Sequence, residues 1–245
     1  MALVDELIAT LSPGIEIPAN LDKDLVFRGL MAIQEPQDFS SEFYRKQDCY
    51  LQEKLRAKGV VKLEDLSPFS NNLYLWQGDI TRLQVDGIVN AANSQMLGCF
   101  VPNHACIDNA IHSQAGLQLR NECHELMQKQ GHLEAIGQAK ITSAYNLPSK
   151  FVLHTVGPVI QDHTSLVQMR ELASCYQSCL ELAVKKGMTS LAFCCISTGE
   201  FHFPNELAAQ IAVQTVKEFC QEHSDLKIVF NVFKDIDLEI YSRLL

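Results

Sequence analysis

From Leu73 to the C-terminus, short apolar runs alternate with longer amphipathic stretches, and this alternation restricts the chain to a small group of folds. Apolar runs of about four to eight residues are typical of buried strands, whereas apolar residues that recur every three or four positions indicate helices. Strands that alternate with helices predict a layered α/β domain around a mostly parallel or mixed sheet. We expect strands at Leu73–Trp76, Gly87–Ala91, Ala139–Ala144, Phe151–Thr155, Ser190–Ile196 and Lys227–Phe233, and helices at Asp108–Ala115, Leu117–Gln130, Leu166–Lys186, Asn205–Glu222 and Asp235–Leu244.

A sheet of this kind binds its ligands in the crevice at the carboxyl ends of its strands. The loops after Ala91 and Ile196 both follow expected strands. We therefore expect these two loops to open at the same edge of the sheet and to form the site.

The loop after Ala91 carries three potential metal ligands, namely Cys99, His104 and Cys106. Two thiolates and an imidazole are usual donors for Zn²⁺, and three protein ligands leave the fourth tetrahedral position open, as catalytic sites require. His104 and Cys106 point to one side only on an extended segment, so the following helix has to begin after Cys106. Spacing alone also allows another interpretation, in which the cysteines are small buried hydrophobic residues and His104 is a hydrogen-bonded loop residue.

Residues 1–68 have a helical pattern, with amphipathic stretches that begin at Leu3, Leu21 and Phe39. We therefore divide the chain into an N-terminal helical extension, residues 1–68, and an α/β domain, residues 69–245. The extension is expected to pack as a helical layer on the core. Alternatively, it forms a wall of the cleft and helps to select the substrate.

Charge and cysteine usage restrict the partners and the compartment. The net charge of −9 argues against non-specific binding to nucleic acid or membranes, because both favour basic surfaces. No apolar stretch of about 18 residues occurs, so no membrane span is expected. The N-terminal sequence lacks the basic leader of a secretory signal, and the nine cysteines follow no disulfide framework. These features predict a cytoplasmic protein and leave its oligomeric state open.

Four motifs resemble those of macrodomains and occur in the family's order: QGDIT at 77–81, VDGIVNAAN at 85–93, IDNAIHSQAG at 107–116 and AFCCISTGEFHFP at 192–204. The resemblance implies a three-layer α/β fold, with a mixed central sheet flanked by helices, that binds ADP-ribose. Most macrodomains have a run of glycines before the helix, but this chain has CFVPNHAC at 99–106. That departure resembles the zinc-dependent branch of microbial protein-ADP-ribose hydrolases. It implies one Zn²⁺ per chain, with Cys99, His104 and Cys106 as its ligands.

The resemblance also implies which residues bind ADP-ribose. Asp79 would accept a hydrogen bond from the adenine amino group, a role that suits a carboxylate because it only accepts. Ile80 would contribute its backbone N–H. Consecutive N–H groups in a loop form an anion-binding concavity without any lysine, and glycine lets the backbone approach the phosphates. The residues implied in this diphosphate loop are Ser197, Thr198, Gly199, Glu200 and Phe201. His202 stands where the family usually has a second glycine.

The implied activity is removal of mono-ADP-ribose from a modified protein side chain, with Asn93 and Asp108 as catalytic residues. Asn93 would bind the distal ribose hydroxyls, and Asp108 would orient a water or accept its proton. Zinc would either polarise a substrate oxygen or lower the pKa of a bound water. The expected partners are ADP-ribose and mono-ADP-ribosylated protein. Two alternatives stay open: a non-catalytic ADP-ribose-binding module with structural zinc, and a hydrolase of small ADP-ribose derivatives.

Overall fold

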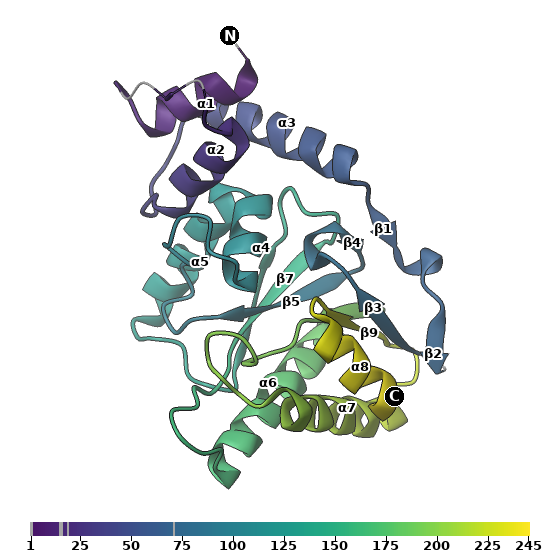
Figure 1. The fold of residues 1–245 in the computed structure, drawn as a ribbon. Helices are drawn as coiled ribbons and strands as arrows, with labels where there is room; N and C mark the ends of the chain where they lie inside the picture. Colours follow the sequence, from purple (N-terminus) through teal and green to yellow (C-terminus); the bar gives the residue numbers. More distant parts are fainter. Residues whose placement is uncertain (1, 15–16, 19, 71) are drawn as a thin grey trace.

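The computed structural model describes residues 2–14, 17–18, 20–70 and 72–245 (Figure 1). Its main sheet consists of β2 (Pro68–Ser70), β3 (Leu73–Gln77), β5 (Gly87–Ala92), β6 (Ala139–Ser143), β7 (Phe151–Val156), β8 (Ser190–Phe193) and β9 (Lys227–Val232). The strand order is β2-β3-β9-β8-β5-β7-β6. The five inner strands are parallel to one another, and the edge strands β2 and β6 are antiparallel to their neighbours. The sheet is therefore mixed, as the sequence predicts.

Helices cover both faces of this sheet. In Figure 1, α4 (Ile107–Ala115) and α5 (Leu117–Gln130) lie on one side of it, and α6 (Leu166–Lys185), α7 (Asn205–Glu222) and α8 (Asp235–Leu244) lie on the other. Strands covered on both faces need apolar side chains on both, which explains their continuous hydrophobic runs. The predicted three-layer α/β architecture is thus confirmed.

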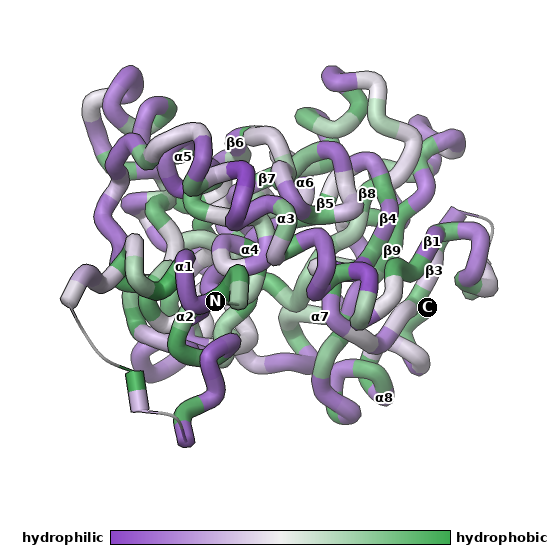
Figure 2. The backbone as a smooth tube through the Cα atoms, turned by 90° about the horizontal axis from the view of Figure 1, so that it is seen from above, coloured by the Kyte–Doolittle hydropathy of each residue, from purple (hydrophilic) through white to green (hydrophobic). Residues whose placement is uncertain are grey.

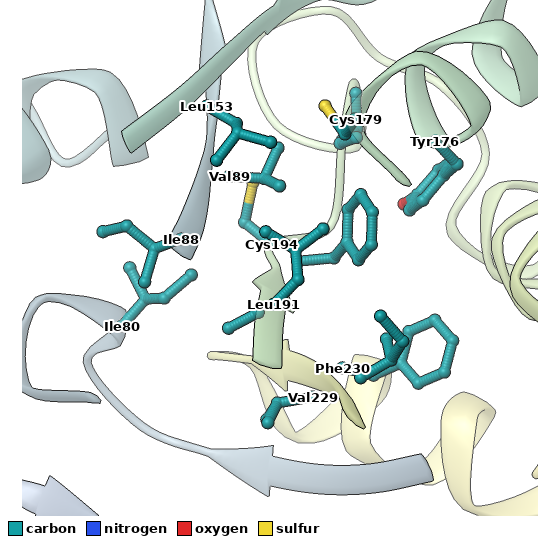
Figure 3. Close-up of a cluster of buried hydrophobic side chains, with 14 of the residues drawn as sticks. Ile80, Ile88, Val89, Leu153, Tyr176, Cys179, Leu191, Cys194, Val229 and Phe230 are labelled. Atoms are coloured by element: carbon teal, nitrogen blue, oxygen red, sulfur yellow. The ribbon is translucent and has the colours of Figure 1, made fainter. Parts of the chain in front are cut away.

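The core lies between the sheet and its two helical layers. Ile88 and Leu191, on adjacent strands, are fully buried, and Figure 3 shows Ile88 beside Ile80 and Leu191 near Cys194 and Val229. Figure 2 shows that hydrophobic and hydrophilic residues alternate along the chain, as expected of elements with one buried and one exposed face. Among the described residues, no helix combines the length and apolar character that crossing a bilayer requires.

The N-terminal part forms α1 (Leu3–Leu11), α2 (Lys23–Ala32) and α3 (Ser41–Lys58). Asp22 and Ser40 accept hydrogen bonds from the first free N–H groups of α2 and α3, so these helices begin slightly later than their apolar patterns predict. The three helices share an apolar cluster of their own, which includes Phe27 and Phe43 and reaches Leu117 of α5. The division of the chain at residues 68 and 69 stays a prediction.

Other boundaries also differ from the sequence-based expectation. β8 ends at Phe193 instead of Ile196, because its ladder with β9 ends at Phe193 and its pairing with β5 at Ala192. The remaining elements are too short to be predicted from a periodic pattern of apolar residues. They are β1 (Val61–Lys62) and its partner β4 (Leu83–Gln84), and the 3₁₀ turns η1 (Leu63–Asp65) and η2 (Ile80–Arg82).

Candidate functional site

Two loops meet at one edge of the sheet. The donor loop, residues 93–106, follows β5, and the Ser197 loop, residues 197–204, follows β8. β5 and β8 are adjacent parallel strands, so their carboxyl ends lie at the same edge. The loops come together where His104 Nε2 lies 3.7 Å from Glu200 Oε1. Both loops therefore open on one site, as the sequence predicts.

The donor loop brings its three predicted metal ligands together. One ligand atom each from Cys99, His104 and Cys106 lies within 4.8 Å of the others, and all three residues are half-buried. Cys99 Sγ is 3.7 Å from His104 Nδ1, while His104 Nε2 faces the Glu200 carboxylate. A metal-binding histidine commonly has such a carboxylate on its second nitrogen. Among the described residues this group contains three donors, so a fourth ligand position would be open.

The chain geometry at Cys106 suits this role. Cys106 is in an extended conformation and forms the N-cap of α4, so the helix begins after it, at Ile107. Burial, together with the nearby Cys99, raises the pKa of the Cys106 thiol to about 12. Without a cation the thiol therefore stays protonated, whereas a bound cation favours the thiolate because it deprotonates a coordinating thiol. The chemistry of the donor set therefore fits a thiophilic divalent ion such as Zn²⁺.

Asn93, the first residue of the donor loop, lies beside Asp108 of α4. Asn93 Nδ2 donates to Gly98 O (3.0 Å) and to Asp108 Oδ2 (3.3 Å), and Asn93 Oδ1 accepts from the N–H groups of Gln95 and Met96. Asp108 is only 5% exposed, and its Oδ1 accepts from Asn90 Nδ2 at 2.8 Å. Burial raises the pKa of Asp108 to about 6, and the hydrogen bond from Asn90 opposes that rise. Both side chains therefore hold the loop in this conformation.

A second group of potential donors lies in the core below Asp108. One ligand atom each from His112, Cys123 and His154 also lies within 4.8 Å of the others. His154 Nε2 is 2.9 Å from Thr142 Oγ1, and its Nδ1 is 3.2 Å from Asn90 Nδ2. Burial lowers the pKa of His154 to about 3. This group is a polar network within the core, in which both ring nitrogens of His154 have protein partners. Neither ring nitrogen of His112 forms a hydrogen bond with a described residue, although its Nε2 lies 3.5 Å from Asp108 Oδ1.

The Ser197 loop is shaped by its own backbone. Ser197 and His202 have positive φ angles of 65° and 56°. Phe203 N donates to Ser197 O at 2.9 Å, and His202 N donates to Gly199 O at 3.0 Å. A Cβ at Gly199 would meet nothing within 4 Å, so open space adjoins its backbone. His202 thus adopts the left-handed conformation that a glycine would readily take.

Gly157 allows this loop to approach the strand beside it. A Cβ at Gly157 would lie 2.0 Å from Ser197 Oγ, which is closer than any contact allows. Ser197 is 5% exposed, and none of the described residues forms a hydrogen bond with its hydroxyl. From the sequence, residues 154–158 are expected to end a strand and to shape the floor of the site without a catalytic role.

Asp79 and Ile80 lie at the start of η2. Asp79 Oδ1 accepts hydrogen bonds from Thr81 N (3.0 Å) and Thr81 Oγ1 (2.6 Å) and so fixes the turn. Asp79 Oδ2 is 4.0 Å from Lys58 Nζ, and the side chain is 35% exposed. Ile80 is buried. One carboxylate oxygen thus holds the turn, and the other remains accessible to a ligand.

Known proteins resemble this chain over most of its length. The model of the family described as Macro domain matches residues 89–212. A protein-ADP-ribose hydrolase from Treponema medium is 51% identical, over 95% of this chain and 91% of that protein. A protein-ADP-ribose hydrolase from Staphylococcus aureus (strain MRSA252) is 49% identical, over 89% of this chain and 83% of that protein.

Solved structures share the fold. A Trypanosoma brucei macrodomain in complex with ADP-ribose is 30% identical, with a TM-score of 0.69 over 86% of this chain and 92% of that one. An Oceanobacillus iheyensis macrodomain with ADP is 38% identical, with a TM-score of 0.66 over 73% of this chain and 93% of that one. Both the family match and the identity to relatives of similar length lead to one conclusion. The chain belongs to the Macro domain family.

Proposed function

We propose that this macrodomain is a hydrolase that removes mono-ADP-ribose from modified protein side chains, and that it holds one Zn²⁺ on Cys99, His104 and Cys106. Two relatives named protein-ADP-ribose hydrolases, 51% and 49% identical over most of their length, support the hydrolase activity. The single observation that carries the zinc proposal is the convergence of the three ligand atoms within 4.8 Å, directly beside the Ser197 loop.

The binding part of the proposal rests on the Ser197 loop and on Asp79. Among the described residues, none accepts a hydrogen bond from the N–H groups of Gly199, Glu200 or Phe201. These groups are available to the diphosphate, and helices or loops that present free N–H groups bind anions without a basic side chain. The accessible Oδ2 of Asp79 accepts from the adenine amino group.

The donor loop then faces the distal ribose and the bond to the modified side chain. When bound there, Zn²⁺ supplies Lewis acidity and a fixed position for an oxygen atom. Asn93 and Asp108 contribute by position, because Asn93 Nδ2 donates both to Asp108 Oδ2 and to the Gly98 carbonyl within the donor loop. Misplacement of reacting groups by about 1 Å can lower a rate about 10²-fold, so these buried contacts affect turnover without touching the adenine.

One assay tests this function. The protein is incubated with mono-ADP-ribosylated protein, with a strong chelator and without it, and the released ADP-ribose is measured. We expect release that stops with the chelator and returns when Zn²⁺ is added. Binding of ADP-ribose without any release would identify a non-catalytic reader. Release from acetylated or phosphorylated ADP-ribose alone would identify a hydrolase of small derivatives.

A further inference from the structure

Helix α2 of the N-terminal part packs directly against the donor loop and α4. Arg28 Nη2 donates to Asn109 Oδ1 at 3.0 Å and lies 3.4 Å from the carbonyl oxygen of His104. Asn103 Nδ2, from the middle of the donor loop, donates to Leu25 O at 3.0 Å. Gly29 permits this approach, because a Cβ there would lie 3.1 Å from Asn103 Nδ2.

Asn109 connects Arg28 to the metal ligands. It is 1% exposed, and its Nδ2 donates to the carbonyl oxygens of Val101 (3.0 Å) and Cys99 (3.4 Å). Its backbone N–H donates to Cys106 Sγ at 3.4 Å. One residue therefore contacts the backbone of one cysteine ligand and the sulfur of the other. Arg28 fixes the Asn109 amide from the opposite side and also reaches the carbonyl of the third ligand, His104.

We propose that Arg28 is a positioning residue for the three metal ligands and acts on them through Asn109, so that α2 is part of the metal site. The inference rests on the proposed function insofar as these ligands hold Zn²⁺. Groups that orient metal ligands without touching the metal typically contribute factors of about 10 to 100 in metal affinity. Both contacts come from one nitrogen, Nη2, which carries two N–H groups and so has one for each acceptor.

The first measurement is the zinc affinity of the purified full-length variants, determined by competition with a chromogenic chelator. We expect Arg28→Gln to weaken zinc binding about tenfold, and Arg28→Lys to weaken it less. Arg45→Gln, which changes an exposed arginine on α3, is the matched control and should bind zinc like the parent. Because Arg28 acts through Asn109, adding Arg28→Gln to Asn109→Ala should cost little more than Asn109→Ala alone.

The second measurement needs no metal. In zinc-free protein, the alkylation rates of Cys99 and Cys106 are followed by peptide mass spectrometry, with the exposed Cys49 as internal reference. Arg28→Gln should raise both rates several-fold relative to Cys49, because the donor loop is no longer held. A parent protein that binds no zinc would contradict the zinc proposal, and the alkylation rates would still decide the role of Arg28.

Thermal unfolding of the same variants separates positioning from general stability. If Arg28 only stabilises the fold, Arg28→Gln lowers the melting temperature but leaves zinc affinity and both alkylation rates at the parent values. That result would overturn the inference.

Discussion

The donor loop and the Ser197 loop leave adjacent strands at the same edge of the sheet, but different interactions hold them. The Ser197 loop is held by backbone hydrogen bonds, between its own residues and from Ile160 N to Phe201 O at 2.8 Å. The donor loop is held by side chains from three other elements: Arg28 of α2, Asn109 of α4 and Arg120 of α5. Arg120 Nε donates to Leu97 O at 2.8 Å, and its guanidinium lies over the Phe100 ring.

This difference corresponds to the two tasks we propose for the loops. A loop held by backbone hydrogen bonds can present free N–H groups to a ligand without side chains from distant elements. A loop that fixes metal ligands needs support from rigid surroundings, because the ligands have to keep one geometry. Binding should therefore depend on the Ser197 loop, and turnover should depend on the donor loop and on its distant supports.

The largest expected effect comes from removing a metal ligand. Cys106→Ser should lose most of the bound zinc and lower turnover of ADP-ribosylated protein about 10²-fold or more, because alignment of the reacting groups is lost. Its affinity for free ADP-ribose, measured by calorimetry, should change little. Cys49→Ser, at an exposed cysteine, is the control. If a metal-free Cys106 variant releases ADP-ribose at the parent rate, the donor loop has no metal-dependent role.

A variant of Asp79 tests which residues determine the affinity for ADP-ribose. Asp79→Ala should weaken ADP-ribose binding by about 1–3 kcal/mol, the usual cost of leaving a buried hydrogen-bonding group without its partner. Thr81→Val removes the hydroxyl bond to Asp79 Oδ1 but keeps the carboxylate, so it measures the contribution of the turn. Calorimetry on both variants is the test. Equal affinity of Asp79→Ala and the parent would mean that adenine is held elsewhere.

The polar network below the donor loop predicts sensitivity to acid. His154 is neutral in the folded protein because burial lowers its pKa to about 3, whereas the unfolded chain takes up a proton below about pH 6.5. Its contribution to stability is thus complete above about pH 6.5 and is lost as the pH falls toward 3. Between pH 7 and 5 the parent should lose on the order of 2 kcal/mol more unfolding free energy than His154→Gln.

Urea denaturation of both proteins at each pH measures this difference in unfolding free energy. Values at pH 7 and 8 provide the reference, because there His154 is mainly neutral in the folded and in the unfolded protein. The groups that face His154 are Asn90, Cys123, Thr142 and, with ring centroids 6.1 Å apart, His112. An equal loss in parent and variant would mean that another buried group takes up the proton.

The same comparison explains what the sequence can and cannot predict. The strands follow from local pattern, and the extended segment before Ile107 places His104 and Cys106 on one side. That Cys99 joins them follows only from the resemblance to the zinc-dependent branch of the family, because spacing alone also allows a structural role for these residues. The sequence also predicts the edge at which both loops open. These features need only the order of the elements and the geometry of a parallel sheet.

The supports of the donor loop leave no such local signal. Arg28 and Asn109 are 81 positions apart, and in the sequence Arg28 looks like any polar residue on an amphipathic helix. Nor does the sequence show that Asp108 is buried or that Asn93 uses its amide inside the loop, because those contacts depend on how the loop folds back over α4. The catalytic roles predicted for Asn93 and Asp108 stay predictions.

The smallest expected effect concerns the close approach of Gly157 to the Ser197 loop. In Gly157→Ala the new methyl group would overlap Ser197 Oγ, so the hydroxyl or the loop has to move. Overpacking of this kind costs typically about 1–3 kcal/mol, and we expect ADP-ribose affinity to fall about tenfold while zinc content stays at the parent level.

Ser197→Ala provides the matched test of this explanation. The Ser197 hydroxyl is buried without a described hydrogen-bond partner, so its removal alone should cost little. Added to Gly157→Ala, it removes the 2.0 Å overlap and leaves the new methyl 3.0 Å from Ile196 Cγ2 and 3.3 Å from Ser197 Cβ. Affinity should therefore return in part. If the double variant binds ADP-ribose no better than Gly157→Ala, the overlap with the Ser197 hydroxyl is not what couples Gly157 to binding, and the remaining 3.0 Å contact with Ile196 Cγ2 becomes the next one to relieve.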